Sequence, residues 1–167
     1  LVDGVYAHWH TVYKWAQKHC QVMLMFISRG WYHSKWCTKE WFEDYKGMRD
    51  EMPKIFIVLL DDLPVKGYRI DDGDANSEGT WVPEETPKKP RDFWIEEIQK
   101  MQASVLSDGL TAEPTDKTFG GRLDPENVLD CSAYQLWAQG RAGKRELKKA
   151  AEEMELLLEK ILQATGR

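Results

Sequence analysis

Cysteine is scarce in this sequence. The three cysteines, Cys20, Cys37 and Cys131, are spread over 167 residues. A secreted disulfide framework needs a denser and even-numbered set, and a structural zinc site needs closely spaced Cys or His ligands. The number and spacing of the cysteines exclude both, and they favour a reducing setting.

The sequence also lacks a long hydrophobic run. No uninterrupted apolar stretch is longer than Ile55 to Leu60, whereas a membrane-spanning helix needs about 20 apolar residues. No stretch has the pattern of a signal peptide. We therefore expect no membrane segment in this chain, and a cytoplasmic location.

An excess of positive charge is absent as well, since the formal net charge is −5. The one dense basic cluster, Lys144 to Lys149, is interrupted by an acid and reads as the solvated face of a helix. Nucleic-acid binding needs a basic surface, so we expect no nucleic-acid partner. His8 and His10 would point to different sides of a helix, and we expect no metal site.

Two apolar runs indicate buried strands, VMLMFI at residues 22–27 and Ile55 to Leu60. Six consecutive apolar residues are typical of a strand covered on both faces. Helical periodicity precedes each run, over Val5–His19 and over Trp36–Met52. This alternation predicts an α/β fold with a parallel sheet and crossover helices.

In such sheets the functional crevice lies beyond the carboxyl ends of the strands. The loop from Ser28 to Lys35 leaves one such end, and the Asp61–Asp62 pair leaves the other. The two aspartates could bind a metal or cap the next turn, and we favour capping.

For the rest of the chain the sequence predicts a loop region and two helices. Val65–Pro90 is mostly loop, with Gly79–Pro83 as a short edge strand. Arg91–Leu106 is a helix, with Asp92 as its N-cap. Gly143–Ala164 is a helix whose apolar seam packs on the domain or on a second copy, the former being favoured. We divide the chain into a domain (1–110), a linker (111–130) and a helical tail (131–167).

The stretch MFISRGWYHSKWCTKEW, residues 25–41, contains the candidate site residues. Ser34 can cap a helix that carries Glu40 in its second turn, and this explains both residues without a functional site. Alternatively, a carboxylate beside aromatic rings suits a sugar with hydroxyl groups, and could stabilise an oxocarbenium-like charge. For Cys37, a buried structural thiol is favoured over a nucleophile.

The same stretch resembles the conserved segment of Toll/interleukin-1 receptor (TIR) domains, S-x-x-[FY]-x-x-S-x-W-C-x-x-E. Five residues stand in register, and the expected aromatic is present as Trp31 or Tyr32. The five are Ser28, Ser34, Trp36, Cys37 and Glu40. Further matching features follow in the family's order, namely IFIVLLDDLP, TWVP, and an FW pair formed by Phe93 and Trp94.

The resemblance implies a flavodoxin-like parallel sheet. In the enzymatic branch of the family, the matching glutamate serves cleavage of the nicotinamide–ribose bond of NAD⁺, giving nicotinamide and linear or cyclised ADP-ribose. Glu40 would then be catalytic, and Trp36 and Ser34 would bind substrate; NAD⁺ is substrate, and no cofactor is implied. In the other branch, TIR domains perform no chemistry and signal by assembling with one another, and Phe93 and Trp94 would serve an interface.

The family also carries a first strand, a helix, a second strand and a pocket loop before this region. None is found ahead of Val5, and the chain opens with Leu1. The expectation is therefore a TIR domain without its N-terminal half. NAD⁺ hydrolysis in defence or cell-death signalling, a form of innate immunity, is then expected of the parent protein rather than of this chain alone.

Overall fold

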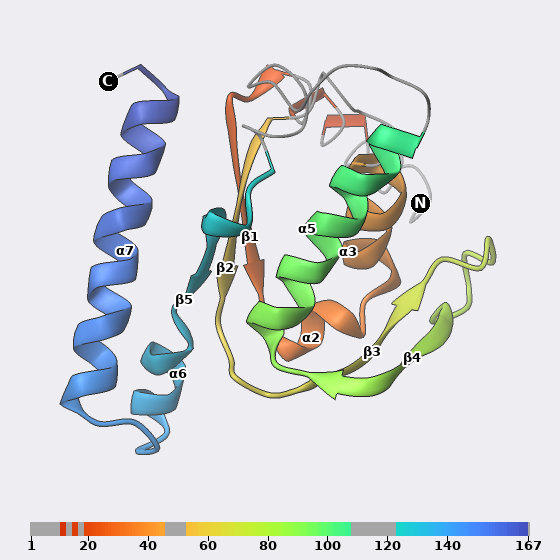
Figure 1. The fold of residues 1–167 in the computed structure, drawn as a ribbon. Helices are drawn as coiled ribbons and strands as arrows, with labels where there is room; N and C mark the ends of the chain where they lie inside the picture. Colours follow the sequence, from red (N-terminus) through yellow and green to blue (C-terminus); the bar gives the residue numbers. More distant parts are fainter. Residues whose placement is uncertain (1–10, 13–14, 17–18, 46–52, 108–122, 167) are drawn as a thin grey trace.

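The computed structural model describes residues 11–12, 15–16, 19–45, 53–107 and 123–166. Its strands and helices alternate along much of the chain (Figure 1). In chain order they are β1 (Val22–Ile27), α2 (Arg29–Tyr32), α3 (Lys35–Lys39), the π-helix η1 (Glu40–Tyr45), β2 (Lys54–Leu59), β3 (Val65–Ile70), β4 (Thr80–Lys88), α5 (Pro90–Ser107), the 3-10 helix η4 (Pro125–Asn127), β5 (Val128–Asp130), α6 (Ser132–Ala138) and α7 (Lys144–Ala164).

A three-stranded parallel sheet in the order β1-β2-β5 forms the centre of the fold. The two strands predicted from apolar runs are confirmed as β1 and β2, which pair in register from Val22 opposite Lys54 to Ile27 opposite Leu59. The mixed α/β class with a parallel sheet is therefore confirmed.

The third strand, β5, comes from the segment expected to be a linker. Val128, Leu129 and Asp130 pair with the end of β2. Leu123, just before η4, is 1% exposed and belongs to the core. The end of the expected 111–130 linker is thus folded structure. Three residues give too short a run to show a period, which is why the pattern missed this strand.

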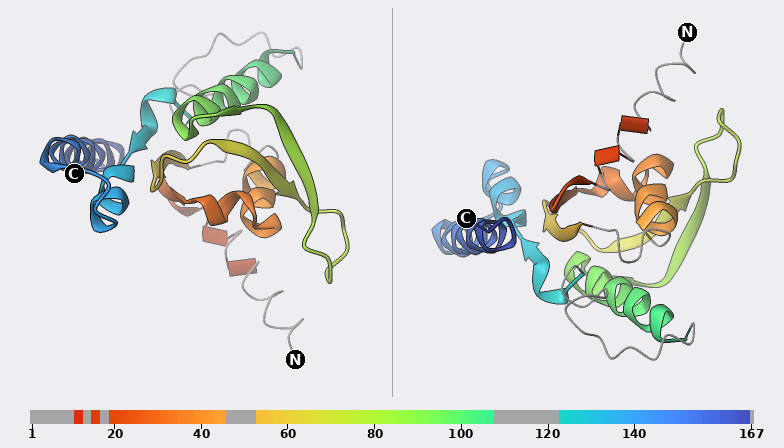
Figure 2. Two further views of the ribbon diagram at one scale, coloured as in Figure 1. Left: turned by 90° about the horizontal axis from the view of Figure 1, so that it is seen from below. Right: turned by 90° about the horizontal axis from the view of Figure 1, so that it is seen from above.

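The central strand β2 is buried on both faces because its side chains alternate between two hydrophobic clusters. Ile55, Ile57 and Leu59 point to the side covered by α5. Phe56 and Val58 point to the opposite side, where they share a cluster with Leu157 of α7. Figures 1 and 2 show α5 and α7 on opposite sides of the sheet.

The helices expected at 91–106 and 143–164 are confirmed as α5 and α7. The first buries Phe93, Trp94, Ile98 and Met101. It begins at Pro90, so Asp92 lies in its first turn and not at the N-cap, which corrects that expectation. Proline is favoured at this position because its fixed φ suits a helix start and its missing N–H has no helical acceptor there.

The tail helix α7 packs on the domain, which is the alternative that we favoured over packing on a second copy. Ala150 and Leu157 of its apolar seam are 1% and 2% exposed. The N-terminal helix expected over Val5–His19 falls largely outside the described residues. So does the end of the helix expected over Trp36–Met52, which begins at Lys35 and continues as the π-helix η1 from Glu40.

Residues 65–90 contain a β-hairpin where the sequence suggested mostly loop. β3 and β4 pair antiparallel as a separate two-stranded sheet, and TWVP is the start of β4. The register shifts between Val65 and Gly67. Gly67 has φ 147°, and a Cβ built there would lie 2.4 Å from the carbonyl oxygen of Val82. Only glycine therefore allows the two strands to approach this closely.

Strand β1 is covered on one face only, in contrast to the expectation of two covered faces. Met25 and Ile27 are buried, whereas Leu24 and Phe26 are 38% and 55% exposed. The reason is topological: β1 lies at the end of the described sheet, and the α7 cluster on this side reaches β2, β5 and, in β1, Val22 at its start.

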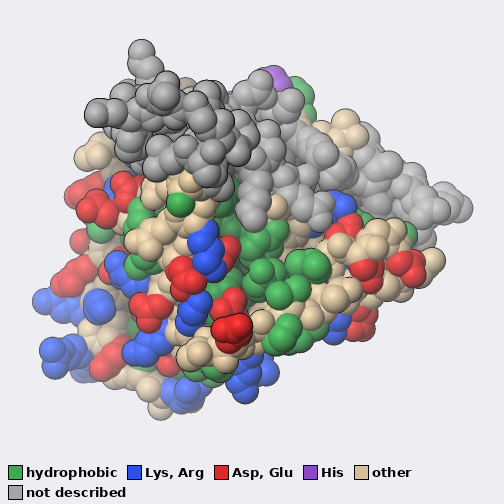
Figure 3. Space-filling view, turned by 45° about the vertical axis from the view of Figure 1, so that its right-hand side comes forward, with side chains coloured by type: hydrophobic (Ala, Val, Ile, Leu, Met, Phe, Trp, Pro, Cys, Tyr) green, Lys and Arg blue, Asp and Glu red, His purple; other side chains and the backbone are tan. Residues whose placement is uncertain are grey.

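Charged side chains of both signs are intermixed on the face shown in Figure 3, around a strip of apolar ones. Ion pairs connect some of them, such as Lys88 with Glu96 at 2.7 Å and Glu96 with Lys100 at 2.9 Å. Among the described residues, no helix combines the length and apolar character that crossing a bilayer requires.

Candidate functional site

The helix that carries the predicted site residues starts directly after the carboxyl end of β1. Ser34 has an extended backbone, and its hydroxyl oxygen accepts the N–H of Cys37 at 3.3 Å. Ser34 is thus the N-cap of α3, as the structural interpretation predicted. The helical turns continue without a break into η1, at whose first residue Glu40 stands.

Trp36 and Glu40 lie on the same side of this helix. The backbone N–H of Glu40 donates to the carbonyl of Trp36, which places the two residues one turn apart. Trp36 is 47% exposed and Glu40 is partly buried. An accessible indole beside a carboxylate can stack on the apolar face of a sugar or base and accept hydrogen bonds from hydroxyl groups.

Cys37 is partly buried and packs against the core, in line with a structural thiol. Cys131 is still less accessible. Burial, followed by the nearby charges of Glu153 and Asp130, raises the pKa of the Cys131 thiol to about 11. A thiol with so high a pKa is not a nucleophile at neutral pH.

Phe93 and Trp94 were expected at an interface, but they lie in the core. They are 1% and 0% exposed. The indole N–H of Trp94 donates to the hydroxyl oxygen of Tyr32 at 2.9 Å. This burial corrects the expectation, because a partner could reach these two side chains only if α5 moved away from the sheet.

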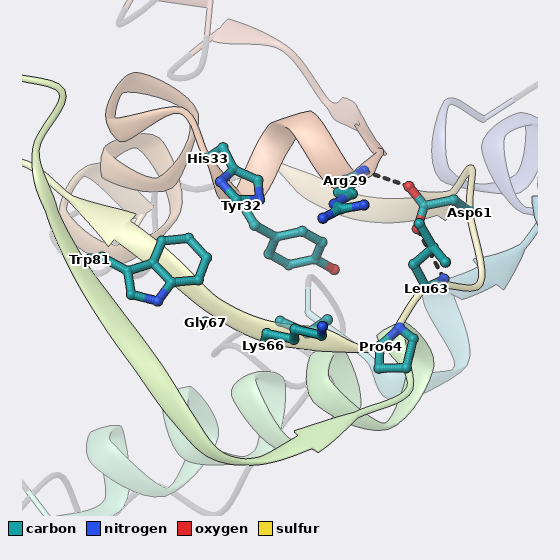
Figure 4. Close-up of a pocket in the computed structure, with 10 residues that line it drawn as sticks. Arg29, Tyr32, His33, Asp61, Leu63, Pro64, Lys66, Gly67 and Trp81 are labelled. Carbon is teal, nitrogen blue, oxygen red and sulfur yellow. Dashed lines mark hydrogen bonds between the residues drawn. The ribbon is translucent and has the colours of Figure 1, made fainter.

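A cavity of about 360 Å³ opens at the carboxyl ends of β1 and β2, where the sequence predicted the functional crevice. Its walls come from α2, the loop after β2 and the β3–β4 hairpin (Figure 4). The lining residues are Arg29, Tyr32, His33, Asp61, Leu63, Pro64, Val65, Lys66, Gly67 and Trp81. Ser34, Trp36 and Glu40 do not line it.

Asp61 organises the loop at this end of the sheet. One carboxylate oxygen accepts the backbone N–H of Arg29, and the other accepts the N–H of Leu63 at 3.2 Å. This confirms capping as the role of Asp61. Within the part of the chain that the structure describes, no group of three or more His, Cys, Asp or Glu could hold a metal ion.

The place of the cavity follows from the two strand ends, but part of its wall comes from residues that the sequence did not single out. Arg29 and His33 fall within the loop singled out after the first strand, and Asp61 within the pair after the second. Lys66, Gly67 and Trp81 were missed because they come from the hairpin. The signal available was the TWVP stretch, which was predicted to be an edge strand and a TIR-like feature but not part of a site.

No protein-family model, no curated protein and no solved structure matches this chain.

Proposed function

We propose that this chain is the C-terminal part of a TIR-like, flavodoxin-like domain whose parent protein hydrolyses NAD⁺, with Glu40 as the catalytic carboxylate. The setting is cytoplasmic defence or cell-death signalling. The observation that carries the proposal is the pair formed by exposed Trp36 and Glu40, one turn apart on the helix after β1. Ser34, whose hydroxyl oxygen accepts the N–H of Cys37, fixes the start of the helix that carries both residues.

The chemistry asked of Glu40 is charge stabilisation. The C–N bond between ribose and nicotinamide breaks, and nicotinamide leaves with the bonding pair. Positive charge then develops on the ribose, where a carboxylate stabilises it. Water adds to the anomeric carbon and loses a proton, giving ADP-ribose. Trp36 would pack against the substrate beside this centre.

The test is nicotinamide release from NAD⁺ by this chain and by the longest natural form of the protein. Glu40→Gln keeps the shape of the side chain but removes its charge, and should lower turnover by at least about 100-fold. Glu152→Gln on α7, an exposed acid, is the matched control and should leave turnover unchanged. Equal turnover of Glu40→Gln and the wild type would refute the assignment of Glu40.

The alternative is a non-enzymatic signalling module that assembles through TIR–TIR contacts. The observation that favours it is the open face of β1, where Leu24 and Phe26 are 38% and 55% exposed. Phe26→Ser should reduce self-association, measured by light scattering. Self-association together with no nicotinamide release from the wild type would favour this alternative.

A further inference from the structure

The cavity at the carboxyl ends of β1 and β2 has the size of a small-ligand site. Its volume of about 360 Å³ lies at the lower end of the range of ligand pockets, roughly 300–1,000 Å³. Pockets of this kind combine apolar walls with a few polar groups that converge on the ligand. Both kinds of wall are present here, at different places in the cavity.

The polar wall consists mainly of hydrogen-bond donors. Figure 4 shows the side chains of Arg29 and Lys66 on either side of the Tyr32 hydroxyl. Within the described parts of the chain, neither the Arg29 guanidinium nor the Lys66 ammonium has an ion-pair partner. Both cations are therefore available to a ligand, and a guanidinium and an ammonium bind phosphate or carboxylate oxygens.

Tyr32 adds a neutral donor to the two cations. Its side chain is 4% exposed, and its hydroxyl oxygen accepts from Trp94. The proton of that hydroxyl has no acceptor among the residues that the structure describes. Burial raises the pKa of Tyr32 well above its usual range, so the hydroxyl keeps this proton at neutral pH.

Asp61 is the one acid in the cavity wall, and its charge opposes an anionic ligand. Both of its oxygens already accept backbone N–H groups, of Arg29 and of Leu63. The wall also contains two cations, Arg29 and Lys66, which outnumber this single acid. The balance of charge in the wall is therefore positive, with His33 counted as neutral.

The aromatic wall comes from Trp81 and His33. Their rings are stacked, with centroids 5.0 Å apart and planes inclined by 20°. Gly67 sits beside the indole, since a Cβ at this position would lie 2.8 Å from a ring carbon of Trp81. The glycine thus lets Trp81 lie close over β3, at the end of the cavity away from Asp61 (Figure 4). Aromatic rings of this kind stack on planar groups of a ligand.

We propose that this cavity binds a small anion that carries a planar ring, of about mononucleotide size. Its phosphate or carboxylate lies against Arg29, Lys66 and the Tyr32 hydroxyl, and its ring lies against Trp81. The site does not depend on the proposed NAD⁺ hydrolysis, because Glu40 is not part of its wall.

The test is calorimetric titration of the full chain with four probes. Adenosine 5′-monophosphate carries both ring and phosphate, adenosine only the ring, and inorganic phosphate only the anion. Indole-3-acetate replaces the phosphate by a carboxylate. We expect adenosine 5′-monophosphate or indole-3-acetate to bind at least tenfold more tightly than adenosine and phosphate, and the tighter of the two identifies the anion.

Lys66→Gln and Arg29→Gln should each weaken binding of the tighter probe by roughly tenfold or more, because each removes a charge-assisted hydrogen bond. Both side chains are exposed, so the fold should persist. Lys148→Gln, on the exposed side of α7, is the matched control and should bind like the wild type. Trp81→Leu should weaken the ring-bearing probes but not inorganic phosphate.

Two results would overturn the proposal. One is the absence of binding of both ring-bearing anions to the wild type at millimolar concentration. The other is binding that Lys66→Gln and Arg29→Gln leave unchanged. Glu40→Gln should bind like the wild type, so failure of the hydrolase proposal and failure of this one are distinguishable.

Discussion

Tyr32 connects α2 to α5 and also lines the cavity. Its ring packs edge-on against Trp31 and Phe93, with centroids 5.5 and 5.7 Å away. Its hydroxyl satisfies the indole N–H of Trp94, which has no exposed surface. One side chain therefore joins α2, at the end of β1, to α5, and also contributes to the cavity wall.

Removing this hydroxyl should be costly. Tyr32→Phe leaves the buried N–H of Trp94 without its acceptor, and we expect the free energy of unfolding to fall by about 1–3 kcal/mol. Urea unfolding measures this loss. Tyr134→Phe, at a position 45% exposed, is the control and should change stability by less than about 0.5 kcal/mol. Equal effects of the two substitutions would mean that the hydrogen bond contributes nothing measurable.

At the scale of elements, charged side chains attach the hairpin to α3. The Lys39 ammonium donates to a carboxylate oxygen of Asp71, just after β3. Lys35, which is 4% exposed, donates to the backbone carbonyl of Asp74 and lies 3.7 Å from Asp71. The hairpin carries Lys66 and Trp81, so these contacts also hold one wall of the cavity in place.

The attachment should weaken in acid. The hydrogen bond from Lys39 is the main cause that lowers the pKa of Asp71 below its ordinary value. The stabilisation is therefore present above the unfolded pKa, about 3.9, and is lost as the pH falls through the lower folded pKa. Asp71→Asn should be less stable than the wild type at pH 7, and the difference should shrink toward pH 2.

Urea midpoints of both proteins across this pH range test the prediction. Asp62→Asn, at an exposed position, is the control and should follow the wild type more closely. A difference between Asp71→Asn and the wild type that stays constant with pH would exclude this ion pair as its cause.

The elements also show what the sequence could predict. β1 and β2 were predictable because each contains an uninterrupted apolar run, and α5 and α7 because their apolar residues recur with a helical period. The hairpin was missed because β4 contains Pro83 and Pro87 together with several charges, which lower strand propensity. The position of the cavity followed from the strand ends, but the pairing that brings Trp81 to His33 is non-local and leaves no pattern in the sequence.

For the whole molecule, α7 completes the fold by covering the second face of β2. Leu157 is 2% exposed and shares a cluster with Phe56, Val58 and Leu129. Lys160 of the same helix donates to the carbonyl of Glu126 at 2.7 Å, just before β5. The helical tail of the sequence is therefore a layer of the domain.

Neighbouring leucines of α7 test this packing. Leu157→Ala should lower the free energy of unfolding by about 2–5 kcal/mol, because it opens a cavity in a closed cluster. Leu158→Ala, at the next position but 58% exposed, should change stability by less than about 0.5 kcal/mol. Equal unfolding midpoints of the two variants would contradict the placement of α7 against the sheet.

The lateness of α7 in the chain has a consequence for synthesis. Ribosomes add about 5–20 residues per second, so β2 emerges several seconds before Leu157 does. During that interval Phe56 and Val58 have no cover, and β5, which pairs with the end of β2, also arrives after it. The second face of β2 can be covered only after α7 has been synthesised, so a nascent chain stalled between β2 and α7 exposes apolar side chains to chaperones and proteases.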